Sequence, residues 1–168
     1  MVARVSHYDF PPERLAEIGE AVRAAVHAER GGYDTRLLAA FLGVDRQSGR
    51  SVAVTVASEE DALASSHAEP RDAEPSDVVR YDVAEAYVAD PDTFEACATP
   101  RLHLSTVAAW APQDDPLVGA AFALERGEAV ATLLVAFAEW PQWMQRTGRT
   151  ADVYDLEYFM VRHGAPVR

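Results

Sequence analysis

The sequence has no lysine and no asparagine, and Cys97 is its only cysteine. Without lysine, the chain cannot form a Schiff base or supply the lysine of a phosphate-binding P-loop. Without asparagine, it has no N-glycosylation acceptor and no site that depends on a catalytic asparagine. A single cysteine excludes an internal disulfide, which fits a reducing compartment.

Long apolar runs and an excess of positive charge are also missing. No run approaches the ~18–20 apolar residues of a membrane-spanning helix, and Met1 is followed by Val-Ala-Arg-Val-Ser rather than by a secretory signal peptide. The formal net charge of −12 argues against nucleic acid and anionic membranes as partners, because both are polyanions. We therefore expect a cytoplasmic protein that binds neither nucleic acid nor membrane.

The first half of the chain follows the order β-α-β-β-α-β, which is typical of a ferredoxin-like unit. Apolar residues recur at three- and four-residue steps between Glu13 and Arg30, which predicts an amphipathic helix that ends at Gly31-Gly32. Short apolar or alternating runs bounded by turn residues predict strands around this helix. The strands are expected at 2–10, 37–44, 51–57 and 78–88, with a second helix that starts at Ser58.

The second half repeats much of this order, which indicates a tandem repeat. Ala39-Ala40-Phe41 corresponds to Ala120-Ala121-Phe122 at the start of each hairpin. Only Pro112–Val118 joins the first two strands of the second half, which is too short for the long helix of the first. The predicted division is 1–89 for the first half, 90–99 for a linker and 100–168 for a second half that lacks its first helix. The elements of the second half are expected at 101–110, 119–124, 129–137 and 151–161 for strands and at 140–146 for a short helix.

Four segments of the first half resemble the antibiotic biosynthesis monooxygenase-like superfamily of dimeric α+β barrels. They are Phe10-Pro-Pro-Glu-Arg-Leu-Ala-Glu, Gly31-Gly-Tyr33, Leu42-Gly-Val-Asp-Arg-Gln-Ser-Gly-Arg50 and Ala57-Ser-Glu-Glu-Asp-Ala-Leu63. The resemblance covers Arg4 to Val88, about half of the chain. It implies an α+β fold, a ferredoxin-like dimeric α/β barrel, which this chain would build from two fused halves. No oligomer is then required to complete the barrel.

The residues that carry chemistry in that superfamily are not all present. Its cofactor-independent, quinone-forming monooxygenases use an asparagine, a tryptophan and a tyrosine, and its haem-degrading members use asparagine, histidine and tryptophan. This chain has no asparagine, and it carries Ala57-Ser58 near the usual tryptophan position. An oxygenase built on this chain must therefore use a different set of side chains.

Histidines and aromatic residues are the remaining candidates. His7 in the first strand is the candidate general base, because an imidazole titrates near neutral pH; a histidine that is satisfied at the barrel interface or exposed is the alternative. Aromatic rings could stack on a flat polycyclic ligand, although rings in this pattern also occur as plain core. The pocket candidates are Tyr8, Phe10, Tyr33, His103, Trp110, Trp140 and Trp143. No histidine, aspartate or glutamate pair has metal-ligand spacing, so we expect no metal site.

These features lead to a ranked functional prediction. The first is a cofactor-independent oxygenase or related tailoring enzyme that acts on a hydrophobic aromatic small molecule, with no bound cofactor. The ligand cavity is then expected in the first half, between its sheet and the helix of residues 13–30. The second is a non-catalytic barrel that binds a ligand or associates with proteins. The third is a haem-binding protein that uses His7 or His103.

Overall fold

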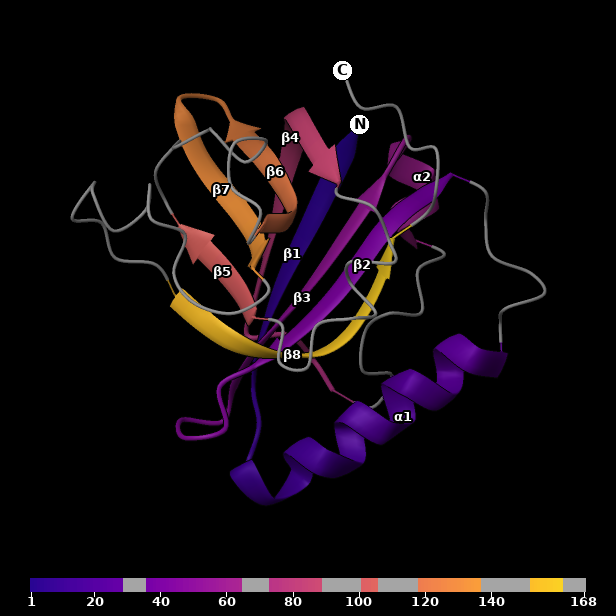
Figure 1. Cartoon of the computed structure of the whole chain (residues 1–168), viewed down its shortest axis with the longest axis vertical. Coiled ribbons are helices and arrows are strands. Elements are labelled where there is room, and N and C mark those ends of the chain that lie inside the picture. The colour runs from indigo at the N-terminus through magenta and orange to yellow at the C-terminus, as the bar shows by residue number, and fades with distance from the viewer. Residues whose placement is uncertain (29–35, 65–72, 89–100, 106–117, 137–151, 162–168) are drawn as a thin grey trace. The chain divides into compact units, whose positions relative to one another are not determined.

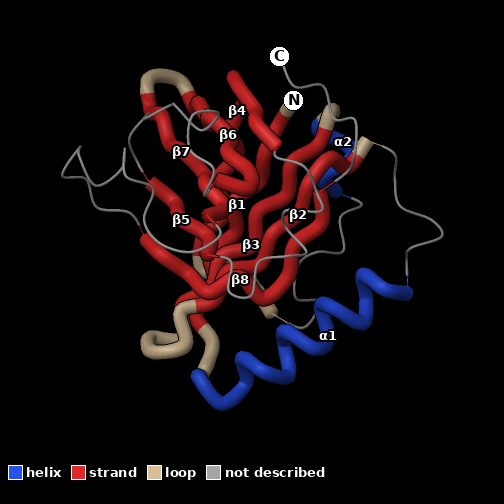
Figure 2. The backbone as a smooth tube through the Cα atoms, viewed as in Figure 1, coloured by secondary structure: helices blue, strands red, loops and turns tan. Residues whose placement is uncertain are grey.

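A computed structural model of the chain describes residues 1–28, 36–64, 73–88, 101–105, 118–136 and 152–161. Over these residues the protein is of the α+β class, with a mostly antiparallel sheet and two α-helices (Figures 1 and 2). The helices are α1 (Leu15–Ala28) and α2 (Glu60–Ala64), and a 3-10 turn at Pro12–Arg14 precedes α1. The strands are β1 (Val2–Asp9), β2 (Leu37–Val44), β3 (Arg50–Ala57), β4 (Asp77–Val88), β5 (Arg101–Ser105), β6 (Val118–Arg126), β7 (Ala129–Ala136) and β8 (Asp152–Val161).

The predicted elements are confirmed where the structure describes them. Each expected strand of both halves is present, with ends that shift by a few residues, as ends commonly do. The strand predicted at 101–110 is described only at Arg101–Ser105, and the helix predicted at 140–146 lies outside the described residues. The division into 1–89, 90–99 and 100–168 stays a prediction.

Contacts between Cα atoms divide the chain into two units. The first unit comprises Met1–Tyr81 and Leu156–Arg162, and the second comprises Asp82–Asp155 and His163–Arg168. The boundaries fall inside β4 and β8, so each of these strands contributes one end to each unit.

In the first unit the strands are hydrogen-bonded in the order β4-β1-β3-β2-β8. The central strand β3 pairs antiparallel with β1 from Val2↔Ala57 to Asp9↔Arg50, without interruption. It also pairs antiparallel with β2, where the register shifts once between Leu37 and Ala39. Figure 1 shows β1, β3 and β2 side by side, so β3 lies between two strands that both precede it in the chain. Because partners across an antiparallel pair share a face, the register fixes which side chains lie together.

In the second unit the order is β8-β5-β7-β6-β4. Its central strand β7 pairs antiparallel with β5 and with β6, and the β6–β7 register shifts between Val118 and Ala120. The β6–β7 loop has two residues, and Gly127 takes the first position with a φ of 61°. A type II′ hairpin turn requires positive φ at that position, which glycine adopts without a steric penalty.

Helix α1 begins at Leu15, two residues after the predicted start at Glu13. Pro12 lies in the first turn, where its missing N–H is not needed, and the Arg14 N–H donates to the Pro11 carbonyl at 2.9 Å. The helix buries Leu15 and Ile18 against the sheet, while Glu17 and Glu20 on its other side are exposed. This division is the amphipathic pattern that the three- and four-residue spacing predicts.

The β2–β3 hairpin is held by Asp45. Its carboxylate accepts hydrogen bonds from the Ser48 hydroxyl at 2.5 Å and the Gln47 N–H at 2.9 Å. These bonds stabilise the charged form and lower the pKa of Asp45 from the ordinary 3.8. Gly49 has a φ of 79°, and its carbonyl accepts from the Phe10 N–H at 3.0 Å. The hairpin therefore fixes the backbone that leaves β1 for α1.

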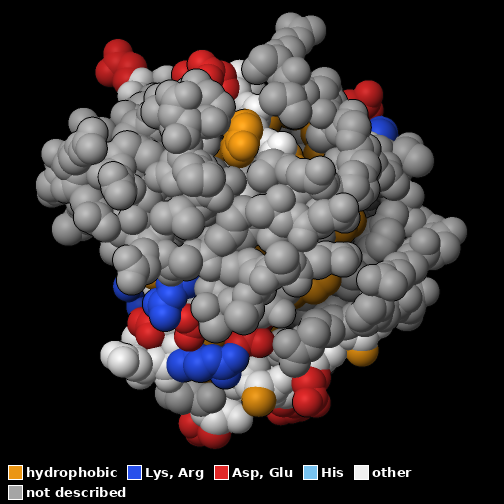
Figure 3. All heavy atoms as spheres, viewed as in Figure 1, with side chains coloured by type: hydrophobic (Ala, Val, Ile, Leu, Met, Phe, Trp, Pro, Cys, Tyr) orange, Lys and Arg blue, Asp and Glu red, His pale blue; other side chains and the backbone are white. Residues whose placement is uncertain are grey.

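Charged side chains of both signs occupy the described surface. Figure 3 shows acidic and basic side chains next to one another at the lower edge of its view. Arg80 pairs with Glu60 at 2.5 Å, and Arg46 pairs with Glu157. No described helix is long and apolar enough to cross a membrane.

Candidate functional site

The register of the first unit separates two faces of its sheet with different chemistry. One face carries Tyr8, the adjacent Ser51 and the adjacent Val44, and it packs under Leu15 and Ile18 of α1. We call this the α1-covered face. By strand alternation, its members on β1 are Arg4, Ser6 and Tyr8, and its members on β3 are Ser51, Ala53 and Thr55. The opposite face carries Val5 and His7 on β1 and Val52, Val54 and Val56 on β3.

An aromatic pair marks the α1-covered face. The rings of Tyr8 and Phe10 stack with their centroids 5.4 Å apart and their planes within 9° of parallel. Both side chains are buried, at 2% and 7% exposure. They belong to one cluster, which also contains Leu15, Ile18, Leu42, Val44 and Ala53, with Ala73 and Tyr158 at its edge. Two pocket candidates of the first strand are thus brought together under the predicted helix.

The same face holds buried polar groups. Ser6, Ser51 and Thr55 are 0–1% exposed, and they are the buried polar side chains among the described residues. The opposite face is aliphatic at the corresponding positions, where Val5, Val52 and Val54 are 0–1% exposed. Burying a hydroxyl costs free energy unless it finds a hydrogen-bond partner, so a sheet face that only packs against a helix gains nothing from three of them.

Ser51 is the hydroxyl that stands out. Its Oγ is fully buried and has no hydrogen-bond partner among the described residues. Ser6 and Thr55, in contrast, each take part in an interaction of their own. Most buried side-chain polar atoms in folded proteins are paired, and an exception calls for a specific explanation. A hydroxyl that is unpaired beside an aromatic pair is a group that a ligand could satisfy.

His7 lies on the opposite face from the aromatic pair. It is partly buried, its register partner is Val52, and its backbone carbonyl accepts hydrogen bonds from the Ser76 N–H at 2.8 Å and the Ser76 hydroxyl at 3.2 Å. The structure therefore separates the candidate base from the candidate pocket residues Tyr8 and Phe10. Its catalytic role and its role as a haem ligand stay predictions.

The other predicted pocket residues are not placed with this pair. Tyr33, Trp110, Trp140 and Trp143 lie outside the described residues. His103 lies in β5, where its register partners are Leu134 of β7 and Val153 of β8. The part of the chain that the structure describes contains no group of three or more histidine, cysteine, aspartate or glutamate side chains suited to a metal ion.

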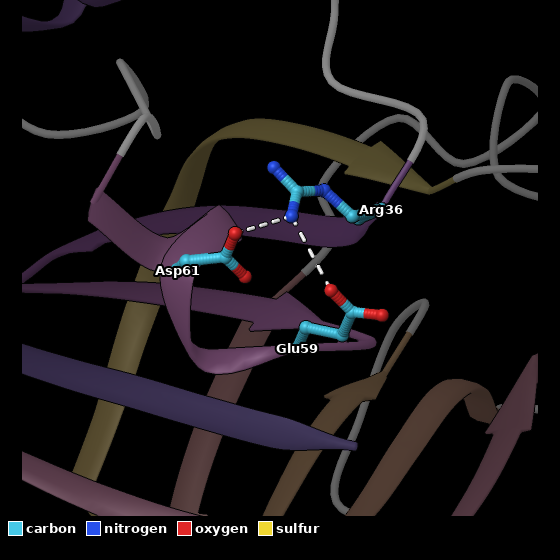
Figure 4. A network of polar contacts seen from close by, with 3 residues as sticks. All are labelled: Arg36, Glu59 and Asp61. Carbon is cyan, nitrogen blue, oxygen red and sulfur yellow. Dashed lines mark hydrogen bonds and ion pairs between the residues drawn. The ribbon is translucent and has the colours of Figure 1, made fainter.

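A charged network near α2 is structural rather than catalytic in character. The guanidinium of Arg36, just before β2, lies 3.3 Å from a carboxylate oxygen of Glu59 and 2.5 Å from one of Asp61. Figure 4 marks these two contacts with dashed lines. The Ser58 N–H also donates to the Arg36 carbonyl at 2.8 Å. All three side chains of the network are exposed to solvent, at 37–68%, where ion pairs contribute little stability. The network fastens the start of β2 to the start of α2.

Sequence reasoning did not single out Ser51 and Thr55 as candidate site residues. The signal was present in β3, where Ser51, Ala53 and Thr55 alternate with Val52, Val54 and Val56. A period of two separates a face of small and polar side chains from an aliphatic face. The register of β1 then shows that the small and polar face is the one that Tyr8 shares.

Comparisons with known proteins support the fold. No protein-family model matches the chain, and no curated protein matches it in sequence. A candidate monooxygenase from Lactobacillus acidophilus NCFM is 12% identical, with 99% of this chain and 98% of that chain covered and a TM-score of 0.63. A candidate monooxygenase from Fusobacterium nucleatum subsp. nucleatum ATCC 25586 is 10% identical, with 98% and 95% covered and a TM-score of 0.65.

An anthrone oxidase-like protein is more distant, at 9% identity, 95% and 92% coverage and a TM-score of 0.49. At such identities the two candidate monooxygenases show that the fold is shared, and the fold alone does not assign a reaction.

Proposed function

We propose that the protein is a cofactor-independent oxygenase or related tailoring enzyme that acts on a hydrophobic aromatic small molecule. The substrate binds on the α1-covered face of the first unit. The observation that carries the proposal is that this one buried face combines a stacked Tyr8–Phe10 pair with buried hydroxyl groups. Small-molecule sites are typically apolar and aromatic, with a few polar groups that fix orientation. The candidate monooxygenases that share the fold favour oxygenation over other reactions.

A cofactor-independent oxygenase needs a substrate that supplies electrons and a binding face that stabilises the deprotonated substrate. Without a cofactor, the electrons that reduce O2 must come from the substrate, which becomes a better electron donor when it is deprotonated. Hydroxyl donors and a cation aimed at the resulting oxyanion favour that form. Arg4 and Thr55 are register partners on this face, two positions from Ser6 and Ala53, and they are suited to such a role.

The proposal includes the superfamily and the tandem architecture. In each predicted half the strands lie in the order fourth, first, third, second. These orders are β4-β1-β3-β2 and β8-β5-β7-β6. Each β2-type strand has its register shift directly before Ala-Ala-Phe, between Leu37 and Ala39 and between Val118 and Ala120. Two copies of one ancestral unit explain a shared irregularity, because bulges are retained within families. When the two Ala-Ala-Phe segments are aligned, Thr55 of β3 corresponds to Leu134 of β7. Arg4 pairs with Thr55 and His103 pairs with Leu134, so His103 takes the position of Arg4 and not that of His7.

Oxygen consumption tests the proposed reaction. We expect the purified protein to consume O2 with a dihydroxynaphthalene such as 1,5-dihydroxynaphthalene, at a rate proportional to protein concentration and without added metal or flavin. Phe10→Leu removes the stacked ring and should lower the rate, whereas Val78→Ala, at an exposed position of β4, should not. Binding without oxygen uptake across a panel of such phenols would contradict an oxygenase.

That outcome would favour the second candidate, a non-catalytic ligand-binding barrel. The absence of asparagine from the whole chain favours it, because the oxygenases that the first half resembles use one.

A further inference from the structure

We infer that Ser51 is the hydrogen-bonding anchor of the ligand site, and that it selects planar aromatic compounds whose ring carries an oxygen substituent, either carbonyl or hydroxyl. This inference rests on the proposed function in one respect: it takes the α1-covered face as the place where the ligand binds. It adds which group on that face recognises the ligand and which chemical feature of the ligand is recognised.

The position of Ser51 is the first reason. It is the register partner of Tyr8 on one side and of Val44 on the other, and both belong to the cluster under α1. Directly opposed side chains in an antiparallel pair have Cβ atoms about 4.5–5.5 Å apart. A ring that stacks beside Tyr8 and Phe10 therefore brings a substituent within reach of the Ser51 hydroxyl.

The unmet hydrogen-bonding capacity of Ser51 is the second reason. Its side chain is 1% exposed, and its Oγ has no partner among the described residues. Neither solvent nor the described protein satisfies it, while Ser6 and Thr55 on the same face are engaged in interactions. An apolar side chain is compatible with this face of β3, because Ala53 occupies the next position on it. The chain nevertheless has a serine at position 51.

The chemistry of a hydroxyl defines the ligand class. A serine hydroxyl is one donor and two acceptor lone pairs, so it can donate to a ring carbonyl or exchange hydrogen bonds with a ring hydroxyl. An unsubstituted or methylated ring leaves the hydroxyl unpaired in a buried place. Sites with a buried polar group discriminate strongly against ligands that leave it unpaired.

The test compares two ligands of the same shape on two proteins. Equilibrium binding of 1-naphthol and of 1-methylnaphthalene is measured by tryptophan fluorescence or calorimetry for the wild-type chain and for Ser51→Ala. The affinity ratio of the two probes reports the anchor, because contributions of ring stacking cancel within it. We expect Ser51→Ala to shift the ratio against 1-naphthol by roughly two- to tenfold, the effect of one hydrogen bond. Ser51→Cys, with a similar size and a weaker donor, should give an intermediate ratio.

Ser58→Ala is the matched control, because Ser58 is an exposed serine just beyond the same strand; it should keep the wild-type ratio. If the ratio is unchanged in Ser51→Ala, Ser51 is not the anchor, while the proposed site stands. If neither probe binds the wild-type chain, the ligand site itself is wrong and the proposed function fails with it. Binding is measured without turnover, so an inactive protein does not obscure the result.

Discussion

At the scale of single residues, the contrast between the two faces of β3 governs what substitutions do. Val52, Val54 and Val56 bury aliphatic surface, whereas Ser51 buries a hydroxyl without a partner among the described residues. Burial of the first kind stabilises the fold by about 25 cal/mol per Å². Burial of the second kind costs stability. A residue that costs stability and is nevertheless present is often there for binding, as functional sites depart from the rules that the rest of the fold obeys.

We predict that Ser51→Ala leaves the free energy of unfolding unchanged or raises it by up to about 1 kcal/mol, because the substitution removes an unsatisfied buried hydroxyl. Val52→Ala, at the neighbouring position on the opposite face, should lower it by about 2 kcal/mol through lost burial and a cavity. Urea unfolding of both variants measures the difference. A clear loss of stability in Ser51→Ala would mean that the hydroxyl is bonded within the protein.

His7 gives a second prediction at this scale. Because His7 lies on the face opposite Tyr8 and Phe10, we expect His7→Ala to keep the affinity for 1-naphthol and the rate per folded molecule. Its effect should appear in the melting temperature alone, since the side chain is partly buried. A general base would instead lose roughly 10²–10⁴-fold in rate. Turnover and melting temperature measured on the same sample separate these cases, and a rate loss of that size with an intact fold would restore His7 as the base.

The sequence predicts part of the candidate site at this scale. Tyr8 and Phe10 are two residues apart on one strand, so their common face follows from the strand period alone. The strand period does not predict that α1 covers this face rather than the face of His7, because β1 has buried residues on both faces. Ser51 joins Tyr8 only through the register of β1 with β3, a long-range pairing that local patterns do not encode.

At the scale of elements, hairpins set the register of both central strands. The β2–β3 loop relies on Asp45 and Gly49, and the β6–β7 loop relies on Gly127. The turn residues in the sequence predicted both hairpins, because glycine and aspartate have specific roles in tight turns. The register shifts in β2 and β6 were not predicted, since nothing in Ala-Ala-Phe or its neighbours requires an unpaired residue.

We predict that Gly127→Ala lowers the free energy of unfolding by about 1–2 kcal/mol, the cost of a left-handed conformation for a residue with a Cβ. A Cβ at this position meets no atom within 4 Å, so a clash does not contribute. Gly127→Asn should recover much of the loss, because asparagine tolerates positive φ. Equal losses in the two variants, measured by urea unfolding, would show that the backbone conformation is not the cause.

The β2–β3 hairpin gives a pH-dependent prediction. The pKa of Asp45 in the folded state is lowered from 3.8, chiefly by the hydrogen bond from Ser48. The charged form therefore stabilises the fold above pH 3.8, and this contribution is lost as the pH falls through the lowered folded-state pKa. Asp45→Asn keeps an acceptor for the Gln47 N–H but carries no charge.

The wild-type chain should accordingly be more stable than Asp45→Asn near neutral pH, by less than about 1 kcal/mol because the site is exposed. The difference should shrink as the pH falls below 3.8. Urea midpoints of both proteins across an acid series measure it, and a difference that grows toward acid pH would contradict the assignment.

At the scale of the whole molecule, the strand pairings support the proposed tandem fusion. The last strand of each predicted half adjoins the second strand of the other, because β4 pairs with β6 and β8 adjoins β2. Such reciprocity is what an isologous dimer interface produces, where each subunit gives the other the same contact. The sequence indicated the repeat through the matching Ala-Ala-Phe segments and through the order of elements. It did not indicate that β4 and β8 are shared between units, since a strand of a given pattern does not reveal its partner.

The last prediction follows from these pairings. Each described strand has a hydrogen-bonded neighbour on both sides, so the fold leaves no strand edge that a second chain must cover. We expect the midpoint of urea unfolding to stay constant over about a hundredfold range of protein concentration, as for a fold that is complete in one chain. Sedimentation measured over the same range gives the oligomeric state independently. A dimer through another surface would also raise the midpoint with concentration, but its monomer would keep its structure on dilution. A midpoint that rises steeply with concentration, together with a dimer that loses its structure on dilution, would mean that a second copy supplies a sheet, which would contradict the proposed fusion.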